Sequence, residues 1–479
     1  MGLARVLTVE LTERASVEVV LDDGTATVTR AFTAVDLSHR LPLLGLRPDT
    51  SYAITVQTDP PGASAELALR TDPLPADFPQ FDVLTHDPAR SEPGYTLLPV
   101  KSGGDPGFLV ILDPSLEPVW YHRATVGFTD VRPGPDGALW GVEGGSVVRV
   151  SLGEGRQGVW HELAGHPESI PVDTLAFHHS VVPQADGSFW ALGWEHLEAE
   201  NHPQSYDPDA PFGRASVADV EVLHVLPDGA VAQRLPLRNL LDPTRLGWDA
   251  LDHQRDYGVD WSHGNALEVD PVAGSLLIGM RHQDAVIEVD QETGEILWIL
   301  ANHAGWPLSL QRHLLRPSPD LLWPFHQHGP KRLADGGLLL FDNRNVVNTP
   351  YDGERDRGRA SRVVCYDVDA TSGTVSQRWE YGDTATGRLF ADSMGDADLL
   401  PTTGNVLATF GNLKADGGGD DAQPDRGDTT ARIIEFHPDD PDPAALDLRV
   451  WSGRAAQPRG WHVYRAERMP TLYPDGVLR

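Results

Sequence analysis

The chain has 479 residues and a formal net charge of −32, so it lacks the basic surface that nucleic-acid binding requires. Its hydrophobic content of 40%, with 39 Pro and 47 Gly, is typical of a folded, turn-rich protein rather than a disordered one. The single cysteine, Cys365, excludes an internal disulfide and the usual cysteine-based zinc and iron–sulfur sites.

The first residues contain no apolar segment that ends at a small-residue cleavage site. No apolar run in the chain approaches the roughly 20 residues that span a bilayer. We therefore expect no membrane span, and a chain that is either cytoplasmic or exported with its signal already removed.

Residues 1–72 alternate between apolar and polar side chains in short runs, which predicts β-strands at 6–10, 16–20, 26–29 and 52–56. Asp22-Asp23-Gly24 is a hairpin signal. Residues 44–52 resemble the turn-and-tyrosine segment of fibronectin type III modules. We expect a small N-terminal β-sandwich over residues 1–72, followed by a Pro- and Asp-rich linker over residues 73–92.

A unit of about 40–50 residues repeats from residue 93 onward, which indicates a β-propeller. In each unit a turn containing glycine separates two strands, and a second pair of strands follows. The aligned turn glycines are Gly137, Gly187, Gly274, Gly336, Gly404 and Gly476. The last unit, at 461–477, has only its first half, and the matching second half lies at 107–121. A blade shared between the two ends would close the ring without an open edge. The predicted fold is all-β, with a six-bladed propeller over residues 93–479.

One position of the repeat carries most of the residues that could perform chemistry. It lies eight residues before the turn glycine, or eleven in the unit with the longest turn. Because the first strand of each blade lines the channel of a propeller, we expect the side chains at this position to meet around one axis. They are Thr129, His179, His263, His328, Asp396 and Arg468.

A single histidine at a strand start most often bonds only to neighbouring backbone. Three histidines at one register, with Asn265 and Arg281 nearby, favour a functional site instead. His326 and His328 are two residues apart, so on a strand they would share a face. His178 and His179 would point in opposite directions; the register favours His179, and His178 stays the alternative.

The chemistry of this cluster favours an anion over a metal. The cluster contains no His-x-Glu or His-x-x-x-His pair, and Arg281 would repel a metal ion, so we expect no metal and no cofactor. A guanidinium fork matches two oxygens of a sulfate or phosphate. Histidines around an anion suggest group transfer, in which one imidazole attacks and another moves the proton. The acidic loop at 416–428 is interpreted as a solvated loop, with calcium binding as the alternative.

Four motifs together resemble the signatures of bacterial arylsulfate sulfotransferases, which work without a nucleotide sulfate donor. They are Asp-Trp-Ser-His-Gly-Asn at 260–265, Arg-His-Gln-Asp at 281–284, Gln-His at 327–328 and Leu-Phe-Asp-Asn at 340–343. The resemblance covers nearly the whole chain. It implies a ping-pong transfer of a sulfuryl group from a phenolic sulfate to a phenol through a sulfohistidine, and it leaves a homodimer open.

The resemblance also assigns roles. It implies that His328 is the nucleophile, that His263 transfers a proton and that His179 is a further site histidine. Asn265 and Arg281 match residues that hold the sulfuryl oxygens. The chain departs from the family in having no signal peptide, no disulfide, and Ser180 where an Asp is expected.

Two other classes of function are compatible with the sequence. One is a non-enzymatic propeller that binds ligands or partners, with structural histidines. The other is a propeller enzyme that depends on a metal or a quinone. An assay of aryl sulfate turnover after chelation separates the three hypotheses.

Overall fold

The computed structural model describes residues 2–478 except 103–105, 164, 208, 256, 359, 385–386, 415–428, 453–459 and 474–476. The acidic loop at 416–428 and the turn glycine Gly476 lie outside the described residues. In the described part of the chain the helices are 3-10 turns: η1 (Leu237–Asn239), η2 (Arg281–Gln283) and η3 (Gln311–His313). No helix there is long and apolar enough to cross a membrane.

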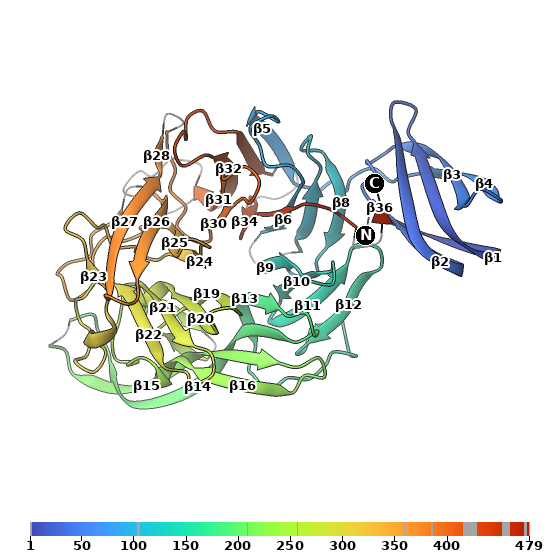
Figure 1. Cartoon of the computed structure of the whole chain (residues 1–479). Coiled ribbons are helices and arrows are strands. Elements are labelled where there is room, and N and C mark those ends of the chain that lie inside the picture. Colours follow the sequence, from blue (N-terminus) through green and yellow to red (C-terminus); the bar gives the residue numbers. More distant parts are fainter. Residues whose placement is uncertain are drawn as a thin grey trace.

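The N-terminal strands form one antiparallel sheet beside the propeller (Figure 1). Across the sheet the order is β36 (Val477–Leu478), β2 (Thr27–Leu43), β1 (Arg5–Asp22), β3 (Ser51–Asp59) and β4 (Ser64–Arg70). The strands predicted at 6–10 and 16–20 are one continuous strand, β1; those at 26–29 and 52–56 overlap β2 and β3, and β4 was not predicted. The described residues form one sheet there rather than the two of a sandwich.

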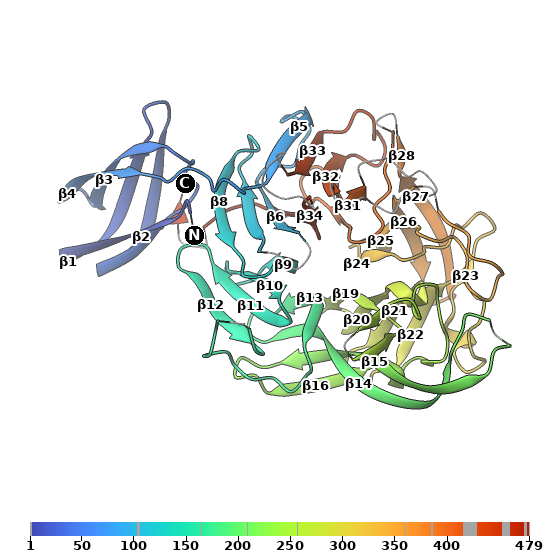
Figure 2. The same ribbon diagram turned by 180° about the vertical axis from the view of Figure 1, so that it is seen from behind.

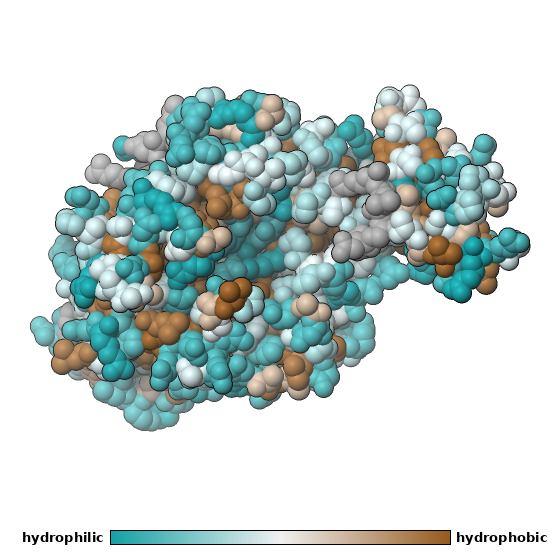
Figure 3. All heavy atoms as spheres, in the orientation of Figure 1, coloured by the Kyte–Doolittle hydropathy of each residue, from teal (hydrophilic) through white to brown (hydrophobic). Residues whose placement is uncertain are grey.

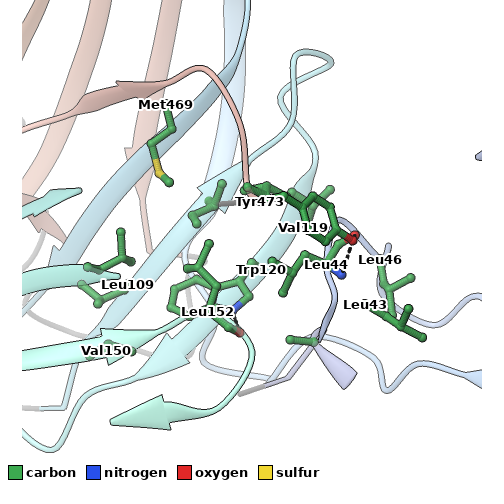
Figure 4. Packing of buried hydrophobic residues seen from close by; sticks show 14 of the residues in the cluster. Leu43, Leu44, Leu46, Leu109, Val119, Trp120, Val150, Leu152, Met469 and Tyr473 are labelled. Atoms are coloured by element: carbon green, nitrogen blue, oxygen red, sulfur yellow. Dashed lines mark hydrogen bonds between the residues drawn. The ribbon is translucent and has the colours of Figure 1, made fainter. Parts of the chain in front are cut away.

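The propeller supplies the layer that a second sheet would supply. Inward residues of β1 and β3 join one apolar cluster with Leu109, Trp120 and Val150 of the propeller (Figure 4). Within it, the Leu44 amide donates to the Tyr473 hydroxyl at 2.9 Å. Alternation predicts that each strand buries one face, but it does not identify what covers that face.

Six further sheets of the described residues surround a common centre (Figures 1 and 2). Blade one contains β34 (His462–Val463) and β35 (Glu467–Met469) beside β6 (Tyr95–Lys101), β7 (Phe108–Leu112) and β8 (Pro118–Arg123). Blade two contains β9 (Phe128–Pro133), β10 (Leu139–Glu143), β11 (Ser146–Ser151) and β12 (Gly155–Trp160). Blade three contains β13 (Phe177–Pro183), β14 (Phe189–Pro203), β15 (Phe212–Val225), β16 (Val231–Pro236), β17 (Gln254–Arg255) and β18 (Gly258–Asp260).

The other three blades follow in chain order. Blade four contains β19 (Gly264–Asp270), β20 (Ser275–Met280), β21 (Ala285–Asp290) and β22 (Ile296–Ala301). Blade five contains β24 (His328–Arg332), β25 (Gly337–Asp342), β26 (Arg362–Asp369), β27 (Thr374–Tyr381) and β23 (Arg316–Pro317). Blade six contains β30 (Asp396–Leu399), β31 (Val406–Lys414), β32 (Thr429–Phe436), β33 (Leu446–Trp451) and β5 (Gln80–His86). A short ribbon, β28 (Asp383–Thr384) with β29 (Gly387–Arg388), lies outside these sheets.

The ring is closed by segments from both ends of the chain. C-terminal β34 and β35 pair with β6, which continues into β7 and β8, so the predicted shared blade is confirmed. The C-terminal segment gives that blade only its inner edge, however, because Val477 pairs with Phe32 in the N-terminal sheet. The expected linker at 73–92 is corrected as well: it contains β5, which pairs with β33 at the outer edge of blade six. Because Pro and Asp residues flank this short strand, its alternation of apolar and polar side chains was not recognised as a strand pattern.

The turn glycines that defined the repeat have the backbone that such turns need. In the five that the structure describes, φ lies between 65° and 88°, a region that side chains with a Cβ rarely adopt. Each turn therefore fixes where the inner strand of its blade ends, and with it the register of the residues at the axis.

Candidate active site

Left-handed backbone marks the starts of the inner strands. His179 and His263 have φ of 53° and 45°, which is uncommon for residues other than glycine and is often found at functional sites. In blades three, four and five the ladder register shifts just after His178, Gly264 and His328. Such bulges redirect side chains, so the inner strands are bent where the site lies.

These strand starts surround a cavity of about 420 Å³ that receives residues from all six blades. The face of the propeller seen in Figure 3 is hollowed near its middle, with hydrophilic residues around the hollow. Four of the predicted site residues, His179, His263, Arg281 and His328, line the cavity. The remaining lining residues are Lys101, Thr129, His178, Trp194, His253, Ser393, Met394 and Tyr464.

Asn343 fixes the tautomer of His328. His328 Nδ1 lies 2.6 Å from Asn343 Oδ1. The Asn343 amide nitrogen donates to the carbonyls of Ala391 and Met394, each at 2.8 Å, so its oxygen must face the imidazole as an acceptor. His328 therefore carries its proton on Nδ1 and its lone pair on Nε2.

The environment of His328 keeps the ring neutral. Its side chain is buried, and burial followed by the positive charge of Arg281 lowers its pKa to about 4. A neutral imidazole with a free Nε2 is a competent nucleophile near pH 7.

His263 is held by a carboxylate. His263 Nδ1 lies 2.6 Å from Asp260 Oδ2, and the His263 amide donates to Asp260 Oδ1 at 3.1 Å. Asp260 ends β18, which pairs in parallel with β15. The carboxylate requires a proton on Nδ1 and leaves Nε2 for proton exchange in the cavity, the arrangement expected of a general acid–base.

Arg281 combines one fixed arm with one unpaired arm. Its Nη2 donates to Asp249 Oδ2 at 3.1 Å, whereas its Nη1 is buried without a hydrogen-bond partner. Burial disfavours the charged form of Asp249, but His326, Arg281 and Arg355 outweigh burial and hold the pKa of Asp249 well below its usual range. The ion pair thus orients the guanidinium, and Nη1 is left to bind an anionic oxygen.

His178 and His179 form one hydrogen-bonded pair. His178 stacks on Trp194 with ring centroids 3.9 Å apart, and its Nε2 lies 3.3 Å from the Gly193 carbonyl, which can only accept. His178 Nδ1 must therefore accept from His179 Nδ1 at 2.7 Å. The His179 ring lies 4.9 Å from that of His263. Both histidines line the cavity, and His179 is the one that contacts His263.

Asn265 lies outside the cavity lining. Its side-chain nitrogen donates to the Gln327 carbonyl at 2.7 Å, and its backbone carbonyl accepts from the Tyr464 hydroxyl at 2.7 Å, whereas its side-chain oxygen is buried without a hydrogen-bond partner. Asn265 therefore joins blade four to the backbone that precedes His328. A contact between Asn265 and sulfuryl oxygens stays a prediction.

Three expectations about the register need correction. Arg468 is not among the cavity residues but pairs with Glu435 at 2.7 Å; Tyr464 takes its place, because the inner strand is interrupted between β34 and β35. Asp396 binds Lys331 at 2.7 Å and is also absent from the lining. His326 shares no strand face with His328, because β24 begins at His328 and His326 has a φ of 54°.

Two groups of side chains in the described residues bring potential metal ligands within 4.8 Å of one another. In the first, Asp260, His263 and His282, the Asp260–His263 hydrogen bond already occupies the carboxylate oxygen and Nδ1. The second contains Asp396, Asp398 and Glu467. Lys331 Nζ contacts the first two of these carboxylates. Internal partners therefore occupy only part of each group, because His282 Nε2, Asp396 Oδ1 and Asp398 Oδ2 are buried without a hydrogen-bond partner.

The fold and the cavity define a β-propeller whose axial site combines imidazoles with an arginine. The chain belongs to the Arylsulfotransferase (ASST) family, whose sequence profile matches residues 117–455. A curated relative, the arylsulfate sulfotransferase AssT of Escherichia coli O6:H1 (strain CFT073), is 30% identical over 142 residues. The matched region covers 26% of this chain and 23% of that relative.

Solved structures give only weak likenesses. The β-propeller domain of Myceliophteria thermophila Cps50 is 11% identical at a TM-score of 0.35, covering 81% of this chain and 100% of that chain. A putative 6-phosphogluconolactonase from Bacteroides uniformis ATCC 8492 is 11% identical at a TM-score of 0.33, covering 91% of this chain and 99% of that chain. The pairing of the strands, not these likenesses, defines the propeller.

Proposed function

We propose that this protein transfers a sulfuryl group from an aryl sulfate to a phenol, with His328 as the covalent carrier. The observation that carries the proposal is the fixed tautomer of His328: Asn343 accepts from Nδ1, so the lone pair of Nε2 is available in a cavity that Arg281 also lines. Family membership supports aryl sulfates as the substrate class.

In the first half of the reaction, His328 Nε2 attacks the sulfur atom and the bond from sulfur to the aryl oxygen breaks. The bonding electrons move to the phenolic oxygen, which takes a proton from His263 Nε2. Asp260 stabilises the imidazolium form of His263 beforehand. Arg281 Nη1 donates to the non-bridging oxygens, which carry the charge of the loose transition state.

The second half reverses these roles. Neutral His263 accepts the proton of an incoming phenol, whose oxygen attacks the sulfur. The bond between sulfur and His328 Nε2 breaks, and its electrons return to the ring nitrogen as a lone pair. The same donors serve both halves, which is the advantage of a covalent carrier.

The cavity lining suits an anion bound to an aromatic group. Its described residues include Arg281 and Lys101 but no carboxylate, although the chain as a whole carries a net charge of −32. His178 and Trp194 stack on one another in the wall. A local positive field in an acidic protein offsets the repulsion of a sulfate ester.

The proposal is tested by turnover of 4-nitrophenyl sulfate with a phenol acceptor, after exhaustive chelation. We expect transfer of sulfate to the phenol at a rate that chelation does not change. An absence of transfer would favour a binding propeller, and loss of transfer on chelation would favour a metal-dependent enzyme.

A further inference from the structure

Lys101 lines the active-site cavity and adds to its positive charge, but no bond-making or proton-transfer step described above uses its side chain. It is the last residue of β6 and pairs in register with His462 of β34. Space for its side chain depends on Gly127, because a Cβ at residue 127 would lie 2.2 Å from Lys101 Cβ. The fold therefore keeps a position open for this lysine.

Within the part of the chain that the structure describes, Lys101 has no carboxylate as a counter-ion, which sets it apart from other cations around the axis. Lys331, Arg281 and Arg465 each contact a carboxylate. No carboxylate of the described residues forms an ion pair with Lys101, whose recorded contact is the Tyr464 ring, 6.0 Å from Nζ. Burial lowers the pKa of Lys101 to about 8. The Lys101 side chain is half-buried, so its ammonium is only partly hydrated, and an anion that enters the cavity meets a donor that no carboxylate of the described residues neutralises.

The place of Lys101 in the ring separates it from the sulfuryl group. Lys101 belongs to blade one and Arg281 to blade four, so blades two and three lie between them on one side and blades five and six on the other (Figure 1). The two cations therefore face each other across the axis. A sulfuryl group bound by His328 and Arg281 places its aryl ring toward Lys101 and Tyr464.

We infer that Lys101 and Tyr464 form a subsite for a second anionic group, such as a carboxylate, on the aromatic ring of the substrate. This inference rests on the proposed function and narrows it to aryl sulfates and phenols that carry a further negative charge. Tyr464 contacts the ring, and the Lys101 ammonium binds the anion at the end remote from the sulfate.

The experiment compares 4-carboxyphenyl sulfate with its neutral methyl ester, using the wild-type protein, Lys101→Met and Lys101→Arg. We expect Lys101→Met to lower the ratio of kcat/KM for the carboxylate to kcat/KM for the ester by about tenfold or more, as for loss of a charge-assisted hydrogen bond. Lys101→Arg should retain most of the ratio. Comparing ratios cancels the different reactivities of the two leaving groups.

Calorimetric binding of 4-hydroxybenzoate and of its methyl ester gives a readout that needs no turnover. Lys101→Met should weaken the acid selectively. An equal loss for both compounds would overturn the inference and make Lys101 a general determinant of the cavity. An unchanged ratio would overturn it too. If the wild-type protein turns over no aryl sulfate but binds 4-hydroxybenzoate through Lys101, the proposed function fails while the anion subsite stands.

Discussion

His328 Nδ1 and Asn343 Oδ1 lie 2.6 Å apart at the same end of the β24–β25 pair, where β24 begins and β25 has just ended. The Asn343 amide nitrogen is committed to two carbonyls, so the pair allows only one tautomer of His328. The lone pair is thereby left on Nε2, the nitrogen that attacks sulfur in the proposed mechanism.

Removal of this acceptor should slow the transfer. Asn343→Ala leaves the Nδ1 proton of a buried ring without a partner, at a cost of about 1–3 kcal/mol, so we expect kcat/KM to fall by about tenfold to one hundredfold. The measurement is steady-state kinetics with 4-nitrophenyl sulfate. Asn345→Ala serves as a control, because it is the same substitution two residues away, and the Asn345 side-chain nitrogen donates to the Asp392 carbonyl rather than contacting His328. A variant at 343 with the full rate would show that the tautomer needs no support from this residue.

The pH dependence of the first step should reflect the low pKa of His328. Burial and Arg281 lower that pKa to about 4, and only the neutral ring attacks. The rate of the phenol burst should therefore persist well below pH 6.5 and decline as pH falls through about 4. In Arg281→Gln the positive charge is gone, so the acid limb should move to higher pH. An acid limb near pH 6.5 in the wild-type protein would contradict this assignment.

Arg281 should contribute through the shape of its guanidinium. Arg281→Ala should lose roughly 2–4 kcal/mol of transition-state stabilisation, as for removal of an oxyanion donor. Arg281→Lys should recover little of this loss, because a point charge cannot replace the fork. Arg355 also pairs with Asp249 but is absent from the cavity lining, so Arg355→Gln is the matched control and should lose far less. Full activity of the Lys variant would mean that only the charge matters.

The contribution of Asp260 to the transfer rate should be largest for substrates whose leaving phenolate needs a proton. Asp260→Asn removes the carboxylate that orients His263 and stabilises its imidazolium. Because general acid catalysis contributes typically about 10²–10⁴-fold, the loss should be large for phenyl sulfate and small for 4-nitrophenyl sulfate, whose phenolate leaves unaided. The check is the slope of log kcat/KM against the pKa of the leaving phenol, which should become steeper in the variant. An equal loss for all leaving groups would show that His263 does not transfer the proton.

The sequence predicted those parts of the fold and site that depend on local chemistry. Turn glycines and alternating strands defined the repeat, and the register placed His179, His263 and His328 in one cavity. The register was wrong for Arg468. Counting eight residues back from the turn glycine, Gly476, assumes an unbroken inner strand, but this strand is interrupted after Val463. Tyr464 was therefore not predicted to line the cavity.

Other features depend on long-range geometry that no local pattern encodes. Lys101 reaches the cavity because Gly127, in the next loop, leaves room for it. Asp249 orients Arg281 from a loop 32 residues upstream in the chain. Burial of one sheet face was evident in residues 1–72, but the partner of that face proved to be the propeller. Each case needed the positions of segments that are distant in sequence.

The central claim is the covalent bond between His328 Nε2 and sulfur, and mapping the trapped adduct tests it most directly. The protein is mixed with an aryl sulfate in the absence of acceptor, quenched and digested under alkaline conditions, since a sulfated imidazole is expected to be acid-labile, and its peptides are analysed by mass spectrometry. The account predicts about one equivalent of phenol released in a burst, a sulfate label on His328, and neither burst nor label in a folded His328→Asn variant. A label on His326, His263 or His179, or phenol release only when both substrates are present, would contradict it.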